Sequence, residues 1–361
     1  MADAPKIAIG AVLPLRVTLG VGTSADAAPS TGNDLATRWR EDLTLLSELG
    51  ITAVRFPFDW SRLQPRPGRL DDDWREFYGG VLDAGAALGL DMWACLFEGV
   101  QPSWFDDDGG FADQRAAGRW WPAWIESAAE AFGDRVAGWV PFDDPVGQAE
   151  RAAGGDSSRH QATIHHLLIA WRDAWRILRG GPPVATALRL AVARPSDDTV
   201  AARDAARLAD RLRWSVWLRA LRDGTSSIPG RVERAIPDLA GALDVLGISV
   251  VADLGDDERA DDGALDRWED RFGAILRRAA EEGPNRPIAI TVRPAREDVD
   301  ERRGVLEAFG RATRYAIGDG VDVAAVFASP AIAGPGGPDA LVDRDRQPTS
   351  CVEAWLAATT G

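Results

Sequence analysis

The chain has 361 residues, of which 45% are hydrophobic and 27% charged, so it can bury a large core and is typical of globular proteins. Its 41 basic and 56 acidic side chains give a net charge of −15, which argues against nucleic acid or an anionic membrane as a partner. The two cysteines, Cys95 and Cys351, exclude a disulfide framework.

The N-terminal segment lacks the pattern of a secretory signal. Asp3 precedes the first lysine, and the short apolar run that follows is broken by Pro14. No run of about 18 apolar residues predicts a transmembrane helix. We therefore expect a cytoplasmic protein, and we predict no cofactor.

Short β-rich runs alternate with amphipathic segments of helical length, eight times along the chain. The predicted strands cover residues 6–12, 52–58, 91–96, 137–142, 184–192, 242–251, 287–291 and 323–328. The predicted helices cover residues 34–49, 74–88, 116–132, 159–178, 199–221, 264–282, 305–317 and 349–358, and most of them are followed by a glycine.

This alternation predicts the fold class. Strands that alternate with helices indicate a parallel sheet, and eight such units predict a closed (β/α)8 TIM barrel. An open, doubly wound sheet would alternate too, but Gly10-Ala11-Val12-Leu13 is not the glycine-rich phosphate loop expected after its first strand. No linker or low-complexity segment divides the chain, so we expect one barrel domain over residues 1–361.

Two adjacent carboxylates, Asp143 and Asp144, end the apolar run of the fourth predicted strand. Pro145 disfavours a helical conformation at Asp144, which places the end of the strand here. In a parallel α/β barrel, active sites are built at this end of the strands. Two interpretations stay open: the acids belong to a functional site, or one of them caps the next segment in a strand-end turn.

Segments spread over nearly the whole chain resemble glycoside hydrolase family 1, the β-glucosidase family. Arg55-Phe56, Trp60-Ser61-Arg62 and Phe77-Tyr78 stand where the family has an Arg-Phe strand, a Trp-x-Arg segment and a Phe-Tyr pair on the next helix. The likeness continues in order through FGDRVAGWVPFDDP, IHHLLIAW, ALDVLGIS, GPNRPIAIT, AIGDGVDVAAVF and LVDRDRQPTSCVEAW. The resemblance implies a glycosidase-like barrel.

The two catalytic positions of that family are changed in this sequence. Retaining glycosidases use two carboxylates about 5 Å apart, one as the acid/base and one as the nucleophile. By resemblance, Asp144 stands at the acid/base position, in Asp-Asp-Pro where the family has Asn-Glu-Pro. Val292 stands at the nucleophile position, in Thr-Val-Arg-Pro where the family has Thr-Glu-Asn-Gly. Aspartate is one methylene shorter than glutamate and valine cannot attack, so the resemblance predicts a degenerate site without retaining activity.

Positions that hold the sugar in the family are changed as well. By resemblance, the lost glutamine, histidine, Asn-Tyr pair and tryptophan fall on Val17, Glu98, Ser249-Val250 and Ala328. Arg55, which braces the nucleophile in the family, is retained. These losses remove the groups that recognise a pyranose by hydrogen bonding.

The polar residues left at the predicted barrel mouth are Arg55, Glu98, Asp143, Asp144 and Arg293. We expect Glu98 and at least one aspartate to converge with one of the arginines, since strand ends share one face of a barrel. The arginines then either simply neutralise the acids, or the cluster forms a pocket in which a crowded carboxylate with a raised pKa acts as an acid.

Three further features have simpler interpretations. The acids could hold Mg²⁺ or Ca²⁺, but the arginines would compete and no histidine helps, so we predict no metal. The histidines His160, His165 and His166 share one predicted helix and are expected to pack or to face solvent. Most tryptophans lie at helical positions and pack helices, whereas Trp104, after the third strand, is the tryptophan we expect to line a cleft.

Two function classes therefore remain open. One is a pseudo-glycosidase that works by binding a small molecule or a protein partner. The other is an enzyme, either a carbohydrate hydrolase or one with new acid/base chemistry from Glu98, Asp143 and Asp144. Fold alone does not separate them, because function resides in the site.

Overall fold

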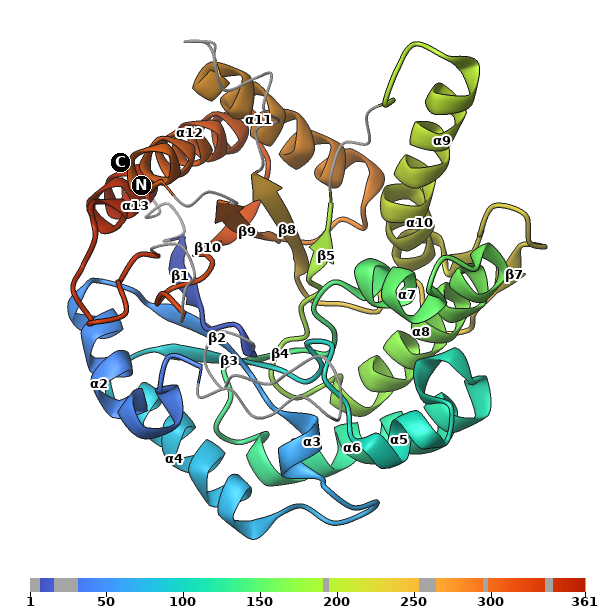
Figure 1. Ribbon diagram of the computed structural model, residues 1–361, viewed down its shortest axis with the longest axis horizontal. Coiled ribbons are helices and arrows are strands. Elements are labelled where there is room, and N and C mark those ends of the chain that lie inside the picture. Colours follow the sequence, from blue (N-terminus) through green and yellow to red (C-terminus); the bar gives the residue numbers. More distant parts are fainter. Residues whose placement is uncertain are drawn as a thin grey trace.

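The structure is a computed structural model, which describes residues 7–15, 32–190, 195–252, 264–294, 298–334 and 340–360. Eight parallel strands form one sheet in the order β4-β3-β2-β1-β10-β9-β8-β5 (Figure 1). A parallel bridge between Trp139 and Val184 joins the two edges and closes the ring. The strands are β1 Ala8–Val12, β2 Ala53–Pro57, β3 Asp91–Cys95, β4 Gly138–Val140, β5 Leu188–Arg189, β8 Leu246–Ala252, β9 Ile288–Pro294 and β10 Val323–Ala328. The predicted (β/α)8 barrel is confirmed.

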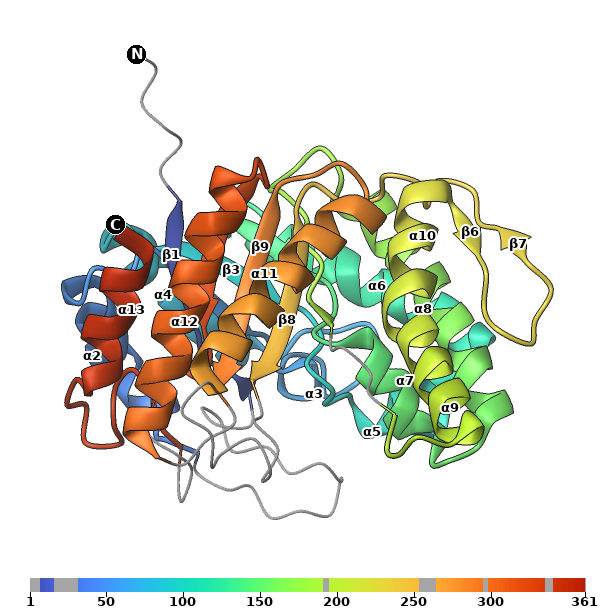
Figure 2. The same ribbon diagram turned by 90° about the horizontal axis from the view of Figure 1, so that it is seen from above.

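Helices surround the strands, with α11 and α12 lying outside β8 and β9 (Figure 2). The long helices are α2 Leu35–Glu48, α4 Asp72–Ala87, α6 Gln114–Phe132, α8 Ser157–Leu178, α9 Val200–Asp210, α10 Val216–Asp223, α11 Ala264–Glu282, α12 Val299–Gly318 and α13 Ser350–Thr360. Shorter ones are α3 Trp60–Leu63, α5 Ser103–Asp107, the 3-10 turn Gly110–Ala112 and α7 Pro145–Ala153. Among the described helices, none is long and apolar enough to cross a membrane.

Local chemistry explains where several helices begin. The side chains of Asp71 and Asp113 accept hydrogen bonds from backbone N–H groups of the first turns of α4 and α6. These caps satisfy donors that have no partner inside the helix. Gly50, after α2, has a φ of 82°, a left-handed conformation that glycine adopts at little cost.

Four differences from the expectation concern the second half of the barrel and its connections. The predicted strand 184–192 is regular only over β5, with isolated bridges at Val184 and Ala185. The predicted helix 199–221 is α9 and α10 joined by a π-helical turn, Arg211–Ser215. Helix α7 was not predicted, although Asp144, Pro145 and Gly154 are ordinary signals for the start and stop of a helix. A small antiparallel hairpin, β6 Thr225–Ser226 with β7 Arg234–Ala235, was also missed.

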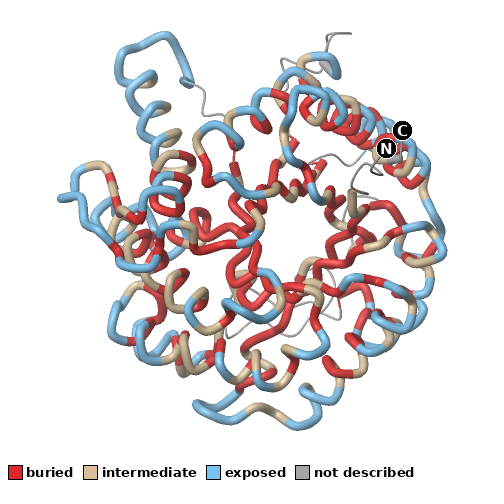
Figure 3. The backbone as a smooth tube through the Cα atoms, turned by 180° about the vertical axis from the view of Figure 1, so that it is seen from behind, coloured by how far each residue is buried: buried red, intermediate tan, exposed pale blue. Residues whose placement is uncertain are grey.

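The barrel strands present two different faces with a period of two residues. One set of alternating residues packs with the helices in the main core, and it includes Ile288, Ile290 and Val292 of β9. The other set points into the barrel, where Val12, Ala53 and Phe327 pack together, and Cys95, Val140, Ala185 and Ala187 form a second interior group. Burial is accordingly concentrated on the strands and on the inward sides of the helices (Figure 3).

Two large rings fill the barrel interior. A Cβ added to Gly138 would lie 2.2 Å from the Trp93 ring, and one added to Gly10 would lie 2.2 Å from the Phe327 ring. Each glycine thus makes room for an aromatic side chain from a neighbouring strand, because no wider residue fits beside the ring. The polar residues of the mouth lie toward the carboxyl ends of these strands.

Candidate functional site

The acids after β4 take different conformations. Asp143 N–H donates to the carbonyl of Phe97, while Asp144 is left-handed, with φ 49° and ψ 62°. Asp144 is the N-cap of α7, and its Oδ1 accepts from the N–H of Gly147 at 3.0 Å. A Cβ at Gly147 would lie 2.1 Å from the other carboxylate oxygen, so the cap depends on this glycine. The capping interpretation is therefore right for Asp144, and Asp143 is the acid that faces Arg55 and Arg293.

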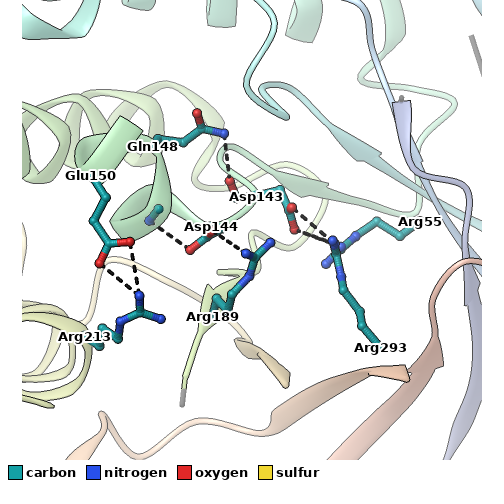
Figure 4. Close-up of polar contacts among 9 residues, drawn as sticks. Arg55, Asp143, Asp144, Gln148, Glu150, Arg189, Arg213 and Arg293 are labelled. Carbon is teal, nitrogen blue, oxygen red and sulfur yellow. Dashed lines mark hydrogen bonds and ion pairs between the residues drawn. The ribbon is translucent and has the colours of Figure 1, made fainter. Parts of the chain in front are cut away.

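Asp143 is held by two arginines from other strands (Figure 4). Arg55 Nη2 donates to its Oδ1 at 2.9 Å, and Arg293 Nη2 lies 3.2 Å from both carboxylate oxygens. Burial opposes ionisation of Asp143, but Arg293, Arg55 and Arg189 outweigh it and lower the pKa. We predicted that Glu98 and at least one aspartate converge with Arg55 or Arg293, and Asp143 does contact both arginines. What the cluster does stays a prediction.

Asp144 has a third arginine beside it, which the sequence reasoning missed. Arg189 Nη1 lies 3.4 Å from Asp144 Oδ2, beyond a good hydrogen bond. Burial raises the pKa of Asp144, and Arg189 and the Gly147 N–H oppose that rise without cancelling it. The expectation of two arginines is thus corrected to three. The signal was readable, because Arg189 is a charged residue inside an apolar run of alternating residues.

Glu98 follows β3 and reaches across to the segment after β1. Its Oε2 accepts from the N–H of Leu15 at 2.9 Å. Burial and the neighbouring Asp143 raise the pKa of Glu98 to about 7, although Arg293, the Leu15 N–H and Arg55 pull it down. Glu98 therefore changes charge near neutral pH, while Asp143 beside it stays ionised.

Val292 does not face the mouth. It is fully buried in the layer between sheet and helices, and its in-register neighbours Val250 and Ala328 lie in the same apolar layer. The adjacent residue of β9, Arg293, points the other way and reaches Asp143. A carboxylate placed at residue 292 would enter an apolar layer, which corrects the expectation from the resemblance that residue 292 stands at a nucleophile position braced by Arg55.

The remaining positions taken from the resemblance have mixed outcomes. Ser249 is buried in register with Arg189, and its Oγ has no hydrogen-bond partner among the described residues. Val17 lies outside the described residues. Trp104 donates its indole N–H to the carbonyl of Gln64 and packs edge-on against Trp60. Its contacts place it in an aromatic cluster; whether it also lines a cleft stays a prediction.

The structure offers little for a metal ion. Among the described residues, no group of three or more His, Cys, Asp or Glu side chains could hold one. The histidines of α8 are partly buried, and His165 and His166 contact Ser226 Oγ and the carbonyl of Phe111 through Nδ1. Burial lowers the pKa of both rings.

The chain is similar to known glycosidases. The profile of glycosyl hydrolase family 1 matches residues 22–234, more than half of the chain. β-Glucosidase A of Thermotoga maritima is 27% identical over 143 residues, covering 39% of this chain and 31% of that protein. Myrosinase 2 of Arabidopsis thaliana is 28% identical over 200 residues, covering 46% and 36%. The matched segments thus span about a third of these curated relatives.

Solved structures extend the likeness to the whole fold. A β-glucosidase from Exiguobacterium marinum superposes with a TM-score of 0.84 at 15% identity, covering 99% of both chains. The family 1 β-glucosidase from Thermotoga maritima gives a TM-score of 0.80 at 17% identity, covering 99% of this chain and 100% of that one. At 17% and 15% sequence identity, these two matches show a shared fold and nothing finer. With the sequence profile matching most of its first two thirds, the chain belongs to glycosyl hydrolase family 1.

Proposed function

We propose that this chain is a family 1 barrel that does not carry out retaining glycoside hydrolysis and instead binds a small molecule at its mouth. One observation carries the proposal: β9 directs Arg293 toward Asp143 and buries Val292, so neither residue at this end of β9 offers the carboxylate that a retaining enzyme needs. A guanidinium stays protonated at any physiological pH and has no lone pair with which to attack a sugar.

The other acids support the same proposal. Asp143 is bound by two arginines, which lowers its basicity and occupies both oxygens. Asp144 is used as a helix cap, in a backbone conformation that turns its short side chain toward Gly147. A binding role needs donors and acceptors at the mouth, and these residues supply them.

The test is turnover of 4-nitrophenyl β-glucoside together with mass spectrometry after treatment with a 2-fluoroglucoside. We expect no turnover above background and no added mass. Val292→Glu is the matched variant: it should also show no activity, and it should lower the stability, because it buries a carboxylate among Val250 and Ala328. A covalent glycosyl adduct on the unchanged chain would overturn the proposal.

A second candidate is an enzyme with new acid/base chemistry. The observation in its favour is that Glu98 and Asp143 have pKa values pushed apart, to about 7 for Glu98 and below the usual range for Asp143. A screen of aryl glycosides that finds activity lost in Glu98→Gln, with a pH profile that bends near neutrality, would favour this candidate over binding alone.

A further inference from the structure

Four buried polar atoms at the barrel mouth have no hydrogen-bond partner among the described residues. They are Nε of Arg189, Nε of Arg293, Oγ of Ser249 and Oδ2 of Asp144. Buried donors and acceptors without partners cost free energy, so several in one place indicate a site whose partners come from outside the chain.

Three of these atoms come from neighbouring strands of one face. Ser249 pairs in register with Arg189 of β5, and Val251 of β8 pairs with Arg293 of β9, so Ser249 lies on the strand between the two arginines. All three point into the barrel, as the alternation of the strands requires. The three together offer two guanidinium N–H groups and one hydroxyl, all of which can donate to a single oxyanion.

The charges at the mouth favour an anion. Three guanidiniums, from Arg55, Arg189 and Arg293, face two aspartates, so one positive charge is left over whenever Glu98 is neutral. The fourth atom, Asp144 Oδ2, has only the long contact to Arg189 and accepts no hydrogen bond among the described residues, so a ligand hydroxyl can donate to it.

We propose that the barrel mouth binds a small hydroxy acid, with its carboxylate on Arg189, Ser249 and Arg293 and a hydroxyl donated to Asp144. The proposal deepens the binding role proposed above and rests on it. The arginines can turn toward such a ligand, since their side chains are 32% and 19% exposed and Arg189 holds Asp144 by a single long contact.

Binding of the anion is linked to a proton on Glu98. The groups that face this carboxylate are Asp143, Arg293, Arg55, the N–H of Leu15 and the Cys95 thiol. An added negative charge nearby favours the protonated form of Glu98 further, so the anion binds more tightly when Glu98 is already neutral. The affinity is therefore expected to fall between about pH 6 and about pH 8.

The experiment is calorimetric titration of the folded chain with sodium D-gluconate, D-glucose and sodium acetate at about pH 6. Gluconate, which has both the carboxylate and the hydroxyls, should bind about tenfold or more tightly than either glucose or acetate. Glu98→Gln should remove most of the change in gluconate affinity toward about pH 8. Equal binding of glucose and gluconate, or no saturable binding of gluconate, overturns the proposal.

Single substitutions test where the carboxylate of the ligand binds. Arg189→Gln should weaken gluconate binding about tenfold or more, and Ser249→Ala about threefold. Because the Ser249 hydroxyl has no partner, Ser249→Ala should bind less without melting earlier, which a merely structural role does not predict. Arg213→Gln is the matched control, since Arg213 pairs with Glu150 of α7 rather than with an aspartate of the mouth, and this variant should bind gluconate like the unchanged chain (Figure 4). Folded Arg189→Gln and Ser249→Ala that both bind like the unchanged chain overturn the assignment.

The experiments distinguish a failure of this ligand proposal from a failure of the proposed function. Gluconate binding together with a covalent glycosyl adduct would overturn the absence of retaining chemistry and leave the ligand class standing. Absence of both would overturn the ligand class alone.

Discussion

Two buried arginine–aspartate clusters in this molecule differ in how many of the guanidinium N–H groups make hydrogen bonds. Arg346 meets Asp42 through two nitrogens, at 2.7 and 3.1 Å, and its other donors reach the carbonyls of Arg344 and Asn33. The pair is almost completely buried, with side chains 3% and 0% exposed, and it ties the C-terminal loop to α2.

The barrel mouth is built differently. Arg189 reaches Asp144 only at 3.4 Å, and both Arg189 and Arg293 keep a buried N–H without an acceptor among the described residues. Every guanidinium nitrogen of Arg346 makes a hydrogen bond, which stabilises the fold, whereas a buried N–H without an acceptor costs stability. The comparison thus sets a fully buried, multiply hydrogen-bonded ion pair against a mouth cluster that, on our proposal, binds a ligand.

The largest effect should come from removing Arg346 from its pair with Asp42. Burial raises the pKa of Asp42, and Arg346 opposes that rise, so Arg346→Ala leaves a buried carboxylate without its partner. We expect a loss of about 3–5 kcal/mol in the free energy of unfolding, measured with denaturant. The exposed Arg344→Ala is the control and should change it by less than about 0.5 kcal/mol. If Arg346→Ala lost no more stability than Arg344→Ala, the Arg346–Asp42 pair would not be the stabilising ion pair that we contrast with the barrel mouth.

Arg55→Ala should cost less, because Asp143 keeps Arg293. Because the Asp143 carboxylate loses one of its two arginines, we expect the free energy of unfolding to fall by about 2 kcal/mol, again measured with denaturant. Arg213→Ala, which removes a more exposed contact to Glu150, should cost about 0.5 kcal/mol. If Arg55→Ala cost as much as Arg346→Ala, the mouth cluster would be structural in the same sense as the Arg346–Asp42 pair.

The pH dependence of stability should reveal Glu98. Its pKa in the folded chain, about 7, lies above the ordinary value of 4.5, so the folded state holds the extra proton between these values. The stability that Glu98 contributes is complete below the lower pKa and is lost as the pH rises through the higher one. Relative to Glu98→Gln, the unchanged chain should lose about 1–2 kcal/mol between about pH 5 and about pH 8. A constant difference across this range would mean that Glu98 is ionised throughout.

The smallest effect should be a gain. Ser249→Ala removes a buried hydroxyl that has no partner and should raise the free energy of unfolding by up to about 1 kcal/mol. Thr186→Val is a useful contrast, because the Thr186 hydroxyl donates to the carbonyl of Gly247 and its loss should destabilise by about 1 kcal/mol. A loss for Ser249→Ala equal to that of Thr186→Val would show that its hydroxyl has a partner in the folded chain.

Much of the architecture could be predicted because it depends on local signals. The period of two in β9, the apolar spacing of α11 and the caps at Asp71 and Asp113 all act within a few residues. Even the orientation of Val292 was readable, since Ile288 and Ile290 precede it on the same alternating set. Extending the strand beyond residue 291 would have placed Val292 with the helices and Arg293 in the barrel.

The sequence by itself determined the order of strands and helices, the ends of most helices and the presence of two acids after the fourth strand. Only the tertiary structure decided which charges meet, because Arg55, Asp143 and Arg293 are separated by 88 and 150 residues. It also decided the left-handed turn at Asp144 and the near-neutral pKa of Glu98. A conformation or a pKa set by burial and by charges from distant strands has no local signal, since both depend on how closely the closed barrel brings those strands together.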